Sequence, residues 1–378
     1  MKFNLIATCA AGVESLVANE LKDMGYTVQT ENGRVRFSGD ETDIVRTNLW
    51  LRVADRVKII VDEFEAKSFT ELFDQTATIP WENYLPMDAA FPVEGKSQKS
   101  TLHSVPDVQA ITKKAIVTSL SNVYHRTTRL PETGAKYPLE VAINKDHVIL
   151  TLDTTGSSLF KRGYRVEKGT APLKENLAAA LILLTNWHKD MPFWDPFCGS
   201  GTLPIEAALI GRNLAPGFNR DFAFEQFGFM DKSIIENERD RADDLADYDT
   251  PLEIHASDID GSMIEIAKTN AREVGLTQDI QFKQVAIADF KTDLTGGVMV
   301  ANPPYGERMS EQEQVHQLYR QMGQAFAPLT DWSKYIITSD LDFEKYYGQK
   351  ATKKRKLYNG ALRTDYFQFW AQRNHNRK

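Results

Sequence analysis

The sequence predicts an α/β protein with a mostly parallel, doubly wound sheet in its carboxyl-terminal part and two smaller α/β domains before it. Three observations support this fold class. Residues 2–61 follow the order strand, helix, strand, strand, helix, strand; the segment 66–160 mixes both kinds of element again; and beyond Gly169 helices alternate with short apolar strands. We therefore expect domains at 1–65, 66–160 and 161–378.

The first domain has the element order of a ferredoxin-like unit. Residues 2–8 alternate like a strand, and residues 13–24 have the spacing of a helix. Asn32-Gly33 predicts a tight hairpin turn, because both residues tolerate the positive φ that such turns need. The remaining predicted elements are strands 26–31, 33–38 and 57–61 and the helix 40–51.

The second domain shows no catalytic pattern. His103, His125 and His147 lack the spacing of metal ligands or of a catalytic triad, so we expect them to be structural or exposed. Asp107 follows Pro106 and is the expected N-cap of a helix. The predicted elements are helices 69–76 and 107–124, an extended stretch 90–95, and strands 138–143 and 146–152.

The third domain shows a Rossmann-like alternation of elements to its end. Its first predicted elements are helix 172–188, strand 192–194, helix 203–210, strand 253–256 and helix 262–274. They are followed by strands 280–284 and 297–301, helix 312–328 and strand 335–338.

Composition narrows the class of protein. With 42% hydrophobic and 26% charged residues the chain reads as globular, and no stretch reaches the roughly 18 apolar residues of a membrane span. Glu14 and Glu20 in the first helical stretch argue against a signal peptide, so we expect a cytoplasmic protein with no membrane partner. Cys9 and Cys198 are too few and too distant for a disulfide framework or a metal cluster, and we expect no metal.

The net charge is −7, so a nucleic-acid site has to be a local basic surface. The stretch 236–249 is strongly acidic, and for it and for the carboxyl-terminal tail we expect a solvated face or a loose end. The basic candidates are residues 353–356, the tail 373–378, and Lys161, Arg162 and Arg165.

A glycine turn, Asp195-Pro196-Phe197-Cys198-Gly199-Ser200-Gly201-Thr202, follows a predicted strand and precedes a predicted helix. Its glycines let the backbone turn tightly and approach a ligand without a Cβ in the way. A nicotinamide-dependent dehydrogenase would carry a third glycine where this chain has Pro204. The turn therefore indicates a different kind of ligand, with a purely structural turn as the alternative.

Acidic residues follow at the ends of the next two strands. Asp258 is placed to accept both hydroxyls of a ribose, and Asp260 to cap the helix that begins near Ser262, although the two can exchange roles. Asp289 can accept a hydrogen bond from an adenine amino group, with Phe290 beside the ring, and a solvated turn is the alternative.

The segment Asn302-Pro303-Pro304-Tyr305 carries the most specific chemistry. It leaves a buried-type strand, and its prolines fix φ, remove backbone donors and force an extended, rigid exit. The side-chain carbonyl of Asn302 and the backbone carbonyl of Pro303 can hold the two hydrogens of an aryl amine and direct the nitrogen lone pair at an electrophile. Tyr305 can stack on an extruded base. These residues specify an aryl amine but not which base carries it.

These elements, in this order, resemble the class I S-adenosylmethionine-dependent methyltransferases, and Asn302 to Tyr305 looks like the motif of those that modify amino groups of bases. Over nearly the whole chain the resemblance is closest to the bacterial ribosomal RNA guanine-N2 methyltransferases, namely the amino-terminal half of RlmL and the stand-alone YpsC-like proteins. The motifs that carry this resemblance are residues 159–165, 171–175, 195–202, 257–260 and 302–308.

The resemblance implies a class I methyltransferase domain with a mostly parallel seven-stranded sheet, preceded by a ferredoxin-like subdomain and a THUMP RNA-binding domain. It implies S-adenosylmethionine as the cofactor, bound by Asp195, Phe197, Gly199, Gly201, Asp258 and Asp289, with Pro172 and Leu173 as weaker candidates. It implies that Asn302, Pro303, Pro304 and Tyr305 position the amine. For RNA contact we single out Lys161, Arg162, Arg165 and Arg308.

We therefore expect direct, in-line methyl transfer to guanine N2 in RNA, with 23S ribosomal RNA or a ribosomal precursor as the partner. No covalent intermediate, metal or strong general base is needed, and Cys198 is expected to be a packing residue. The rivals are a transfer RNA guanine-N2 methyltransferase, a DNA or RNA adenine-N6 methyltransferase and a non-catalytic RNA-binding factor. The sequence does not specify the modified nucleotide or the oligomeric state.

Overall fold

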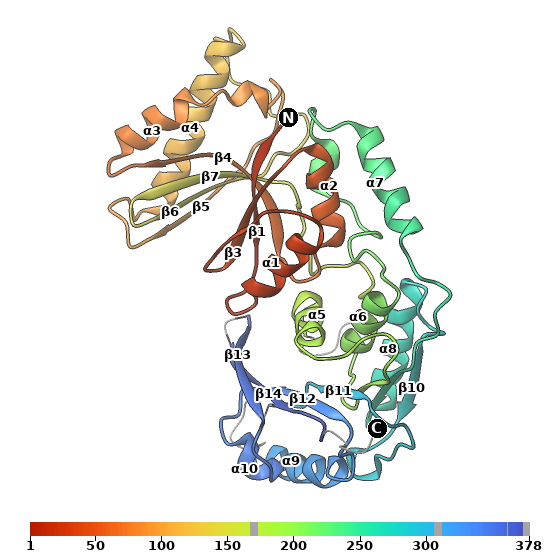
Figure 1. Ribbon diagram of the computed structural model, residues 1–378. Helices are drawn as coiled ribbons and strands as arrows, with labels where there is room; N and C mark the ends of the chain where they lie inside the picture. The colour runs from red at the N-terminus through yellow and green to blue at the C-terminus, as the bar shows by residue number, and fades with distance from the viewer. Residues whose placement is uncertain (167–172, 306–311, 361, 373–378) are drawn as a thin grey trace. The chain divides into compact units, whose positions relative to one another are not determined.

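The computed structural model describes residues 1–166, 173–305, 312–360 and 362–372. It confirms the α/β fold class and contains two compact units, each with one seven-stranded sheet (Figure 1). No helix in the described part of the chain has the length and apolar character needed to cross a membrane. The first unit comprises 1–9, 17–159 and 220–241, and the second comprises 10–16, 160–219 and 242–378.

The first unit follows the predicted element order closely. Its elements are β1 (Phe3–Thr8), α1 (Glu14–Asp23, which begins in the second unit), β2 (Gln29–Glu31), β3 (Arg34–Gly39), α2 (Glu41–Trp50), β4 (Arg56–Glu65), α3 (Phe69–Thr78), β5 (Val93–Gln98), α4 (Val105–Val123), β6 (Leu139–Asn144) and β7 (His147–Asp153). One detail of the prediction is wrong. Helix α4 begins at Val105 with Ser104 as its N-cap, so Asp107 lies inside the first turn.

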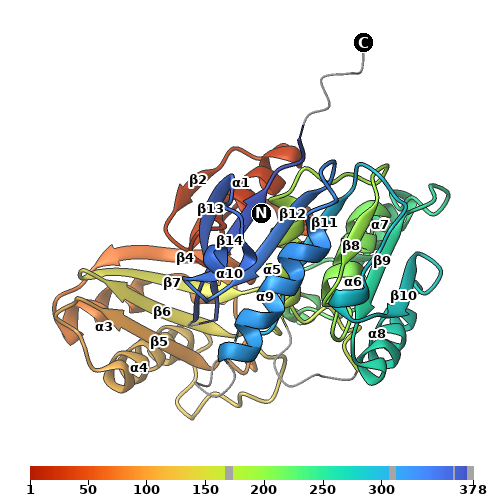
Figure 2. The same cartoon turned by 90° about the horizontal axis from the view of Figure 1, so that it is seen from below.

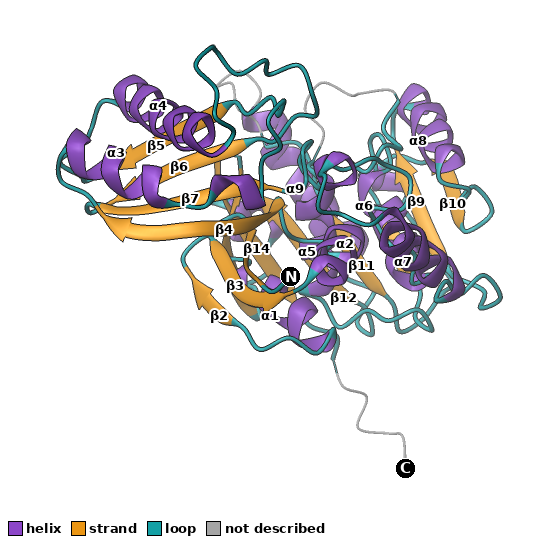
Figure 3. Cartoon of the chain, turned by 90° about the horizontal axis from the view of Figure 1, so that it is seen from above, coloured by secondary structure: helices purple, strands orange, loops and turns teal. Residues whose placement is uncertain are grey.

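The strands of the two small domains form one continuous sheet with the order β2-β3-β1-β4-β7-β6-β5. Strand β4 pairs antiparallel with β1 on one side and with β7 on the other. Helices α3 and α4 lie together on one face of the β5–β7 side (Figure 3). Because β4 serves both halves, it runs to Glu65, four residues beyond the predicted end at 61.

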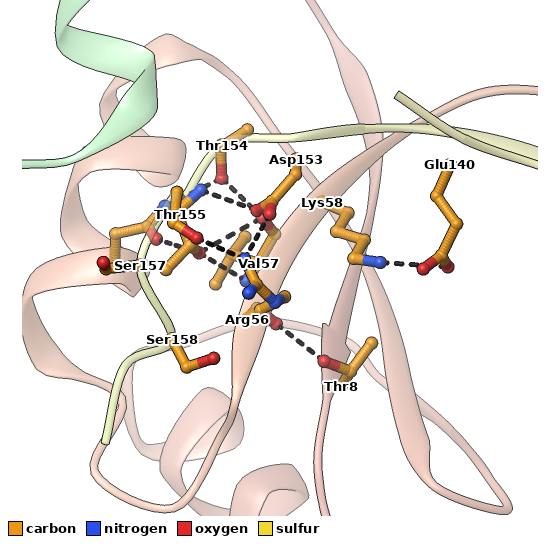
Figure 4. Close-up of polar contacts among 12 residues, drawn as sticks. Thr8, Arg56, Val57, Lys58, Glu140, Asp153, Thr154, Thr155, Ser157 and Ser158 are labelled. Carbon is orange, nitrogen blue, oxygen red and sulfur yellow. Dashed lines mark hydrogen bonds and ion pairs between the residues drawn. The ribbon is translucent and has the colours of Figure 1, made fainter. Parts of the chain in front are cut away.

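Polar contacts join β4 to β7 and to the residues that follow β7 (Figure 4). The Arg56 guanidinium bonds the Asp153 carboxylate, and the Thr154 hydroxyl donates to the carbonyl of Val57 over 2.6 Å. Lys58 is 5% exposed and its ammonium lies 3.0 Å from the Glu140 carboxylate. Satisfied polar groups therefore hold the middle of this sheet together.

A segment of the third predicted domain belongs to the first unit. Residues 220–241 include most of α7 (Lys232–Asp244), whose Glu238 accepts two hydrogen bonds of 3.0 and 2.8 Å from the Arg46 guanidinium. The Phe227 ring stacks on Tyr137 with centroids 4.6 Å apart. The acidic stretch 236–249 therefore starts in a helix with a largely solvated face, and Glu238, which is 6% exposed, is the exception that anchors it.

The second unit contains the doubly wound sheet. Its elements are α5 (Glu175–Leu183), β8 (Phe193–Asp195), α6 (Thr202–Gly211), β9 (Ile254–Asp258), α8 (Gly261–Glu273), β10 (Ile280–Gln284), the 3-10 helix η3 (Ile287–Asp289), β11 (Val298–Ala301), α9 (Gln312–Phe326), β12 (Ser333–Thr338), α10 (Phe343–Tyr347), β13 (Lys353–Asn359) and β14 (Leu362–Phe369). The β13–β14 hairpin was not predicted, because its charged residues read as a surface run.

The strand order in this sheet is β10-β9-β8-β11-β12-β14-β13. Strands β8 to β12 are all parallel, and β14 pairs antiparallel with both β12 and β13. The chain reverses its direction of winding between β8 and β11, and open α/β sheets bind ligands at the carboxyl edge of such a switch point. Helix α9 packs over this sheet through buried residues such as Tyr319, Met322 and Phe326 (Figure 2).

Candidate active site

The glycine turn leaves β8 at the switch point. Gly199 has φ +50° and Gly201 has φ +85°, both in the left-handed region that favours glycine. A Cβ at Gly201 would lie 3.0 Å from the Cβ of Ala267 on α8, so this position also needs a small residue for packing. A Cβ at Gly199 would meet nothing closer than the Met263 side chain at 3.9 Å, so no close contact crowds the backbone there. The turn therefore has room for a ligand against its backbone.

Asp258 is fixed to this turn from the end of β9. One of its carboxylate oxygens accepts from the backbone N–H of Gly199 at 2.9 Å, and the other accepts from the N–H of Asp260 at 3.0 Å. Asp260 caps α8 by accepting from the N–H of Ser262 at 2.8 Å, as predicted. Each Asp258 oxygen keeps a further lone pair, so the carboxylate can accept ribose hydroxyls while it orients the turn.

Asp195 is the buried acid of the site. It is 1% exposed, and one carboxylate oxygen accepts from the backbone N–H of Phe197 at 3.0 Å. Burial raises the pKa of Asp195 well above its usual range; the Phe197 hydrogen bond opposes this, and the nearby charge of Asp258 adds to it. The Asp195 carboxylate is therefore buried within the turn, whereas the Asp258 carboxylate is partly exposed.

The two residues expected to hold an adenine have different environments in the structure. Asp289 is exposed at the end of η3. Phe290 is 6% exposed and packs in the core, with ring centroids 4.9 Å from Trp194 and 5.7 Å from Phe326. The expectation that Phe290 flanks the ring is therefore wrong, because its side chain is committed to the core.

The catalytic segment leaves the strand next to the glycine turn. Strand β11 pairs parallel with β8, so Asn302 to Tyr305 and the turn beginning at Asp195 lie at the same edge of the sheet, at its switch point. The Tyr305 hydroxyl donates to Oδ1 of Asn302 at 2.6 Å. Both residues are half-buried.

Tyr319 supports this segment from α9, and no sequence pattern predicted it. Its hydroxyl lies 3.3 Å from the carbonyl of Pro304 and 2.9 Å from the Thr338 hydroxyl. Burial raises the pKa of Tyr319 to about 12, so the hydroxyl stays protonated and available as a donor. Fifteen residues separate Tyr319 from Pro304, which is why spacing alone gives no signal.

Two of the arginines expected to contact RNA have partners inside the second unit. Arg162 is 2% exposed and its guanidinium lies 3.4 Å from the carboxylate of Glu206, which is fully buried. Arg165 donates to the carbonyl of Leu173 at 2.8 Å and to the Thr202 hydroxyl at 2.9 Å. Lys161 is exposed. Through these contacts Arg162 and Arg165 stabilise the interior of the second unit.

Asn270 on α8 is a further residue that the sequence did not indicate. It is fully buried, donates to the carbonyl of Ser200 at 2.9 Å and accepts from the N–H of Val166 at 3.2 Å. It thus ties the glycine turn to the segment that carries Arg165. Leu173, a weaker cofactor candidate, is 4% exposed, and Pro172 and Arg308 lie outside the described residues.

Profiles of known families match three parts of the chain. The profile described as the RMKL-like methyltransferase domain matches residues 162–368, the RlmL ferredoxin-like domain matches residues 4–58, and the THUMP domain matches residues 66–153. The methyltransferase match alone spans more than half of the chain and includes both the glycine turn and Asn302 to Tyr305.

Relatives match over nearly the whole chain. YpsC of Bacillus subtilis, named as an RNA methyltransferase, is 54% identical over 100% of this chain and 98% of its own length. The ribosomal RNA large subunit methyltransferase K/L of Syntrophotalea carbinolica is 32% identical over 94% of this chain, which spans 52% of that protein. The crystal structure of the methyltransferase SMU.472 with SAH has a TM-score of 0.95 and 54% identity, covering 98% of this chain and 99% of that one.

Proposed function

Because the chain belongs to the RMKL-like methyltransferase family, we propose that it transfers a methyl group from S-adenosylmethionine to the N2 amine of a guanosine in RNA, with 23S ribosomal RNA as the target. The ferredoxin-like, THUMP and methyltransferase domains expected from the sequence are confirmed, and S-adenosylmethionine is the methyl donor. The chain is thus an S-adenosylmethionine-dependent RNA methyltransferase. The choice of guanine N2 and of 23S RNA is the proposal.

One observation carries the part of the proposal that concerns an aryl amine: Asn302 and Pro303, each with a carbonyl acceptor, directly follow β11 at the sheet edge that also holds the glycine turn. An aryl amine has two hydrogens, and two fixed acceptors orient both of them. Holding the amine this way turns its nitrogen lone pair toward one direction, so that positioning supplies much of the rate. When bound, S-adenosylmethionine supplies a methyl group on a positively charged sulfur.

The residues around the glycine turn fit such a cofactor. No close contact crowds the backbone at Gly199, and Asp258 is held there with spare acceptor capacity for ribose hydroxyls. In the proposed reaction the amine nitrogen gains a positive charge when its lone pair bonds the methyl group, and this cation is acidic, so the proton leaves without a strong base. Tyr305 offers a ring on which the extruded base can stack.

The preference for guanine N2 in ribosomal RNA rests on the family resemblance and on the named activity of the K/L relative. The amine-holding geometry itself suits adenine N6 equally well. The THUMP match and the relatives named as RNA methyltransferases favour RNA over DNA. A transfer RNA guanine is therefore the main rival substrate.

Nucleoside mass spectrometry tests the proposal. Ribosomal and transfer RNA from a strain lacking the gene are compared with RNA from strains that express the wild-type protein or Asn302→Ala. We expect one N2-methylguanosine to disappear from 23S RNA in the deletion strain and to return only with the wild-type protein. Loss of a methyladenosine, or loss from transfer RNA alone, would overturn the proposal.

A further inference from the structure

The β13–β14 hairpin is a strongly basic element of an acidic protein. Residues 353–369 contain five Lys and Arg and one Asp, a formal charge of +4 in a chain whose net charge is −7. Strand β13 is the edge of the second sheet (Figure 1). Lysine on an edge strand also discourages strand-to-strand aggregation, but this alone does not account for a cation on β14.

Sheet topology brings one end of this hairpin to the active-site edge. Strand β14 runs antiparallel to β12, with Asp365 opposite Thr338 at the carboxyl end of β12. Strand β13 in turn pairs antiparallel with β14, with Tyr358 opposite Arg363 and Lys356 opposite Asp365. The paired residues Asn359 and Leu362 at this end of the hairpin therefore lie at the same edge of the sheet as Asn302 to Tyr305.

Alternation along β13 sorts its cations onto two faces. Arg355 donates to the carbonyl of Gly12 at 2.7 Å and to the Ser15 hydroxyl at 3.2 Å, so its role is to hold residues 10–16. The opposite face carries Lys354 and Lys356. Lys354 lies 2.9 Å from Glu344, which shows that this face is the one beside α10.

On this face the cations form a row that leads toward the catalytic edge. Lys354, Lys356 and, opposite Tyr358, Arg363 follow one another along the hairpin, and all three are exposed. Within the part of the chain that the structure describes, no acidic group lies within ion-pair distance of Lys356. The Arg363 side chain is 54% exposed, and among the described residues its one ion pair is with Asp365, at 3.6 Å. The distance is long for an ion pair and the cation is exposed to solvent, so the pair is weak and a polyanion can compete for Arg363.

We propose that Lys354, Lys356 and Arg363 bind the phosphates of the RNA strand that leads to the target base; this rests on the proposed function. Side chains two residues apart on one face of a strand are about 7 Å apart, a spacing that suits neighbouring phosphates of an extended strand. The half-buried Tyr358 ring, with the Lys356 ammonium 5.2 Å from its centroid, adds an aromatic surface to the row. These contacts hold the sugar–phosphate backbone of the RNA and do not distinguish one base from another.

The test compares Lys356→Glu/Arg363→Glu with a matched control, Arg272→Glu/Lys283→Glu, in which Lys283 lies on β10 at the other edge of the same sheet and Arg272 lies on α8. Both control residues are exposed, and both variants change the net charge by the same amount. Binding of a labelled, mixed-sequence, 30-nucleotide single-stranded RNA is measured by anisotropy over a series of KCl concentrations. S-adenosylhomocysteine affinity is measured by calorimetry in every variant as a check on the fold.

We expect the hairpin variant to bind this RNA at least roughly tenfold more weakly, and the slope of log affinity against log salt to shrink by about 1.4, for two lost contacts with single-stranded RNA. In methyl transfer to RNA from the deletion strain, KM for RNA should rise. An unchanged slope would overturn the proposal, and so would an equal loss of RNA binding in the control variant. It would also be overturned if the hairpin variant lost binding to anionic lipid vesicles but kept its binding to RNA. Methylation of a base other than guanine would overturn the proposed function but leave this result standing.

Discussion

The Tyr305 hydroxyl donates a 2.6 Å hydrogen bond to Oδ1 of Asn302, the atom that accepts the substrate amine in the proposed reaction. The same tyrosine supplies the ring on which the base is proposed to stack. A carbonyl oxygen has two lone pairs, but a donor already seated on one of them competes with the incoming N–H for the best geometry. The motif therefore satisfies its own acceptor when no base is present.

Tyr305→Phe should separate these two roles. The substitution keeps the ring and removes the competing donor, whose net worth is of the order of 1 kcal/mol. We expect kcat/KM for RNA to be retained or to rise by up to roughly fivefold. Single-turnover methyl transfer with saturating S-adenosylmethionine measures it. Tyr305→Ala provides the contrast, because it removes the stacking surface, worth about 1 to 3 kcal/mol, and should lower kcat/KM. A Phe variant as impaired as the Ala variant would mean that the hydroxyl itself contacts the substrate.

Asn302→Ala should reduce methyl transfer by at least about 10²-fold, because a misoriented amine loses the benefit of positioning. The affinity for S-adenosylhomocysteine should stay near the wild-type value, since no hydrogen bond of the glycine turn involves this side chain among the described residues. Calorimetry and a methyl-transfer assay on the same preparation separate the two effects. Weak cofactor binding with normal turnover at saturation would contradict the assignment.

Asp258→Ala should act on cofactor binding instead. The carboxylate orients Gly199 through a 2.9 Å hydrogen bond and is the proposed ribose acceptor, so its loss removes charged hydrogen bonds worth about 1.5 to 3 kcal/mol each. The dissociation constant for S-adenosylhomocysteine should rise roughly tenfold or more. Asp260→Asn is the comparison, because an asparagine still caps α8. If only the Asp260 variant bound the cofactor weakly, the ribose role would belong to Asp260.

The sequence could predict those parts of the site whose interacting residues lie close together along the chain. The glycine turn is one contiguous segment and Asn302 to Tyr305 is another. Each carries its chemistry in a few adjacent residues, so the sequence alone predicted both. Tyr319, Asn270 and Glu206 act on partners 15, 70 and 44 residues away. Only folding brings them together, and no local pattern marks them.

The same limit explains the unpredicted elements. Helix α7 and the β13–β14 hairpin are rich in charge, so neither shows the apolar periodicity by which buried helices and strands are recognised. Tertiary partners hold them instead: Arg46 binds Glu238 of α7 from 192 residues away, and β14 pairs with the buried β12. Charge on a surface stretch does not exclude regular structure when its neighbours supply the hydrogen bonds.

Arg162 is a cation whose environment the sequence could not indicate, and its variants should report stability. Its side chain and that of Glu206 are 2% and 0% exposed, so Arg162→Met would leave a buried carboxylate without the Arg162 charge, with the Tyr164 hydroxyl still donating to it at 3.1 Å. Breaking a buried pair typically costs about 3 to 5 kcal/mol of unfolding free energy. The double variant Arg162→Met/Glu206→Gln should lose less, because no charge remains unpaired.

Urea unfolding of the two Arg162 variants measures this difference, with Lys161→Met as a neighbouring exposed control. The slope of RNA affinity against salt should be the same for Arg162→Met as for the wild-type protein, provided that the variant is folded. A stable Arg162→Met protein with a smaller slope would restore the original interpretation of Arg162 as an RNA contact.

His255 should make the second unit sensitive to acid. It lies on β9, is 4% exposed, and stacks on Trp194 with centroids 4.5 Å apart; Trp194 directly precedes Asp195. Burial lowers the pKa of His255, and the carboxylate of Glu253, bonded to its Nε2, only partly opposes this. The folded protein therefore favours the neutral ring.

The sign of the pH effect follows from proton uptake. In the unfolded chain the histidine protonates as the pH falls through about 6.5, whereas the folded chain resists protonation down to its lowered pKa. The unfolded state thus binds more protons in this window, and the stability contributed at higher pH is lost as the pH falls through it. His255→Phe keeps an aromatic ring against Trp194 and cannot titrate. We expect the wild-type urea midpoint to fall more than that of the variant between pH 8 and pH 5.5, and parallel pH profiles would show that His255 is not responsible.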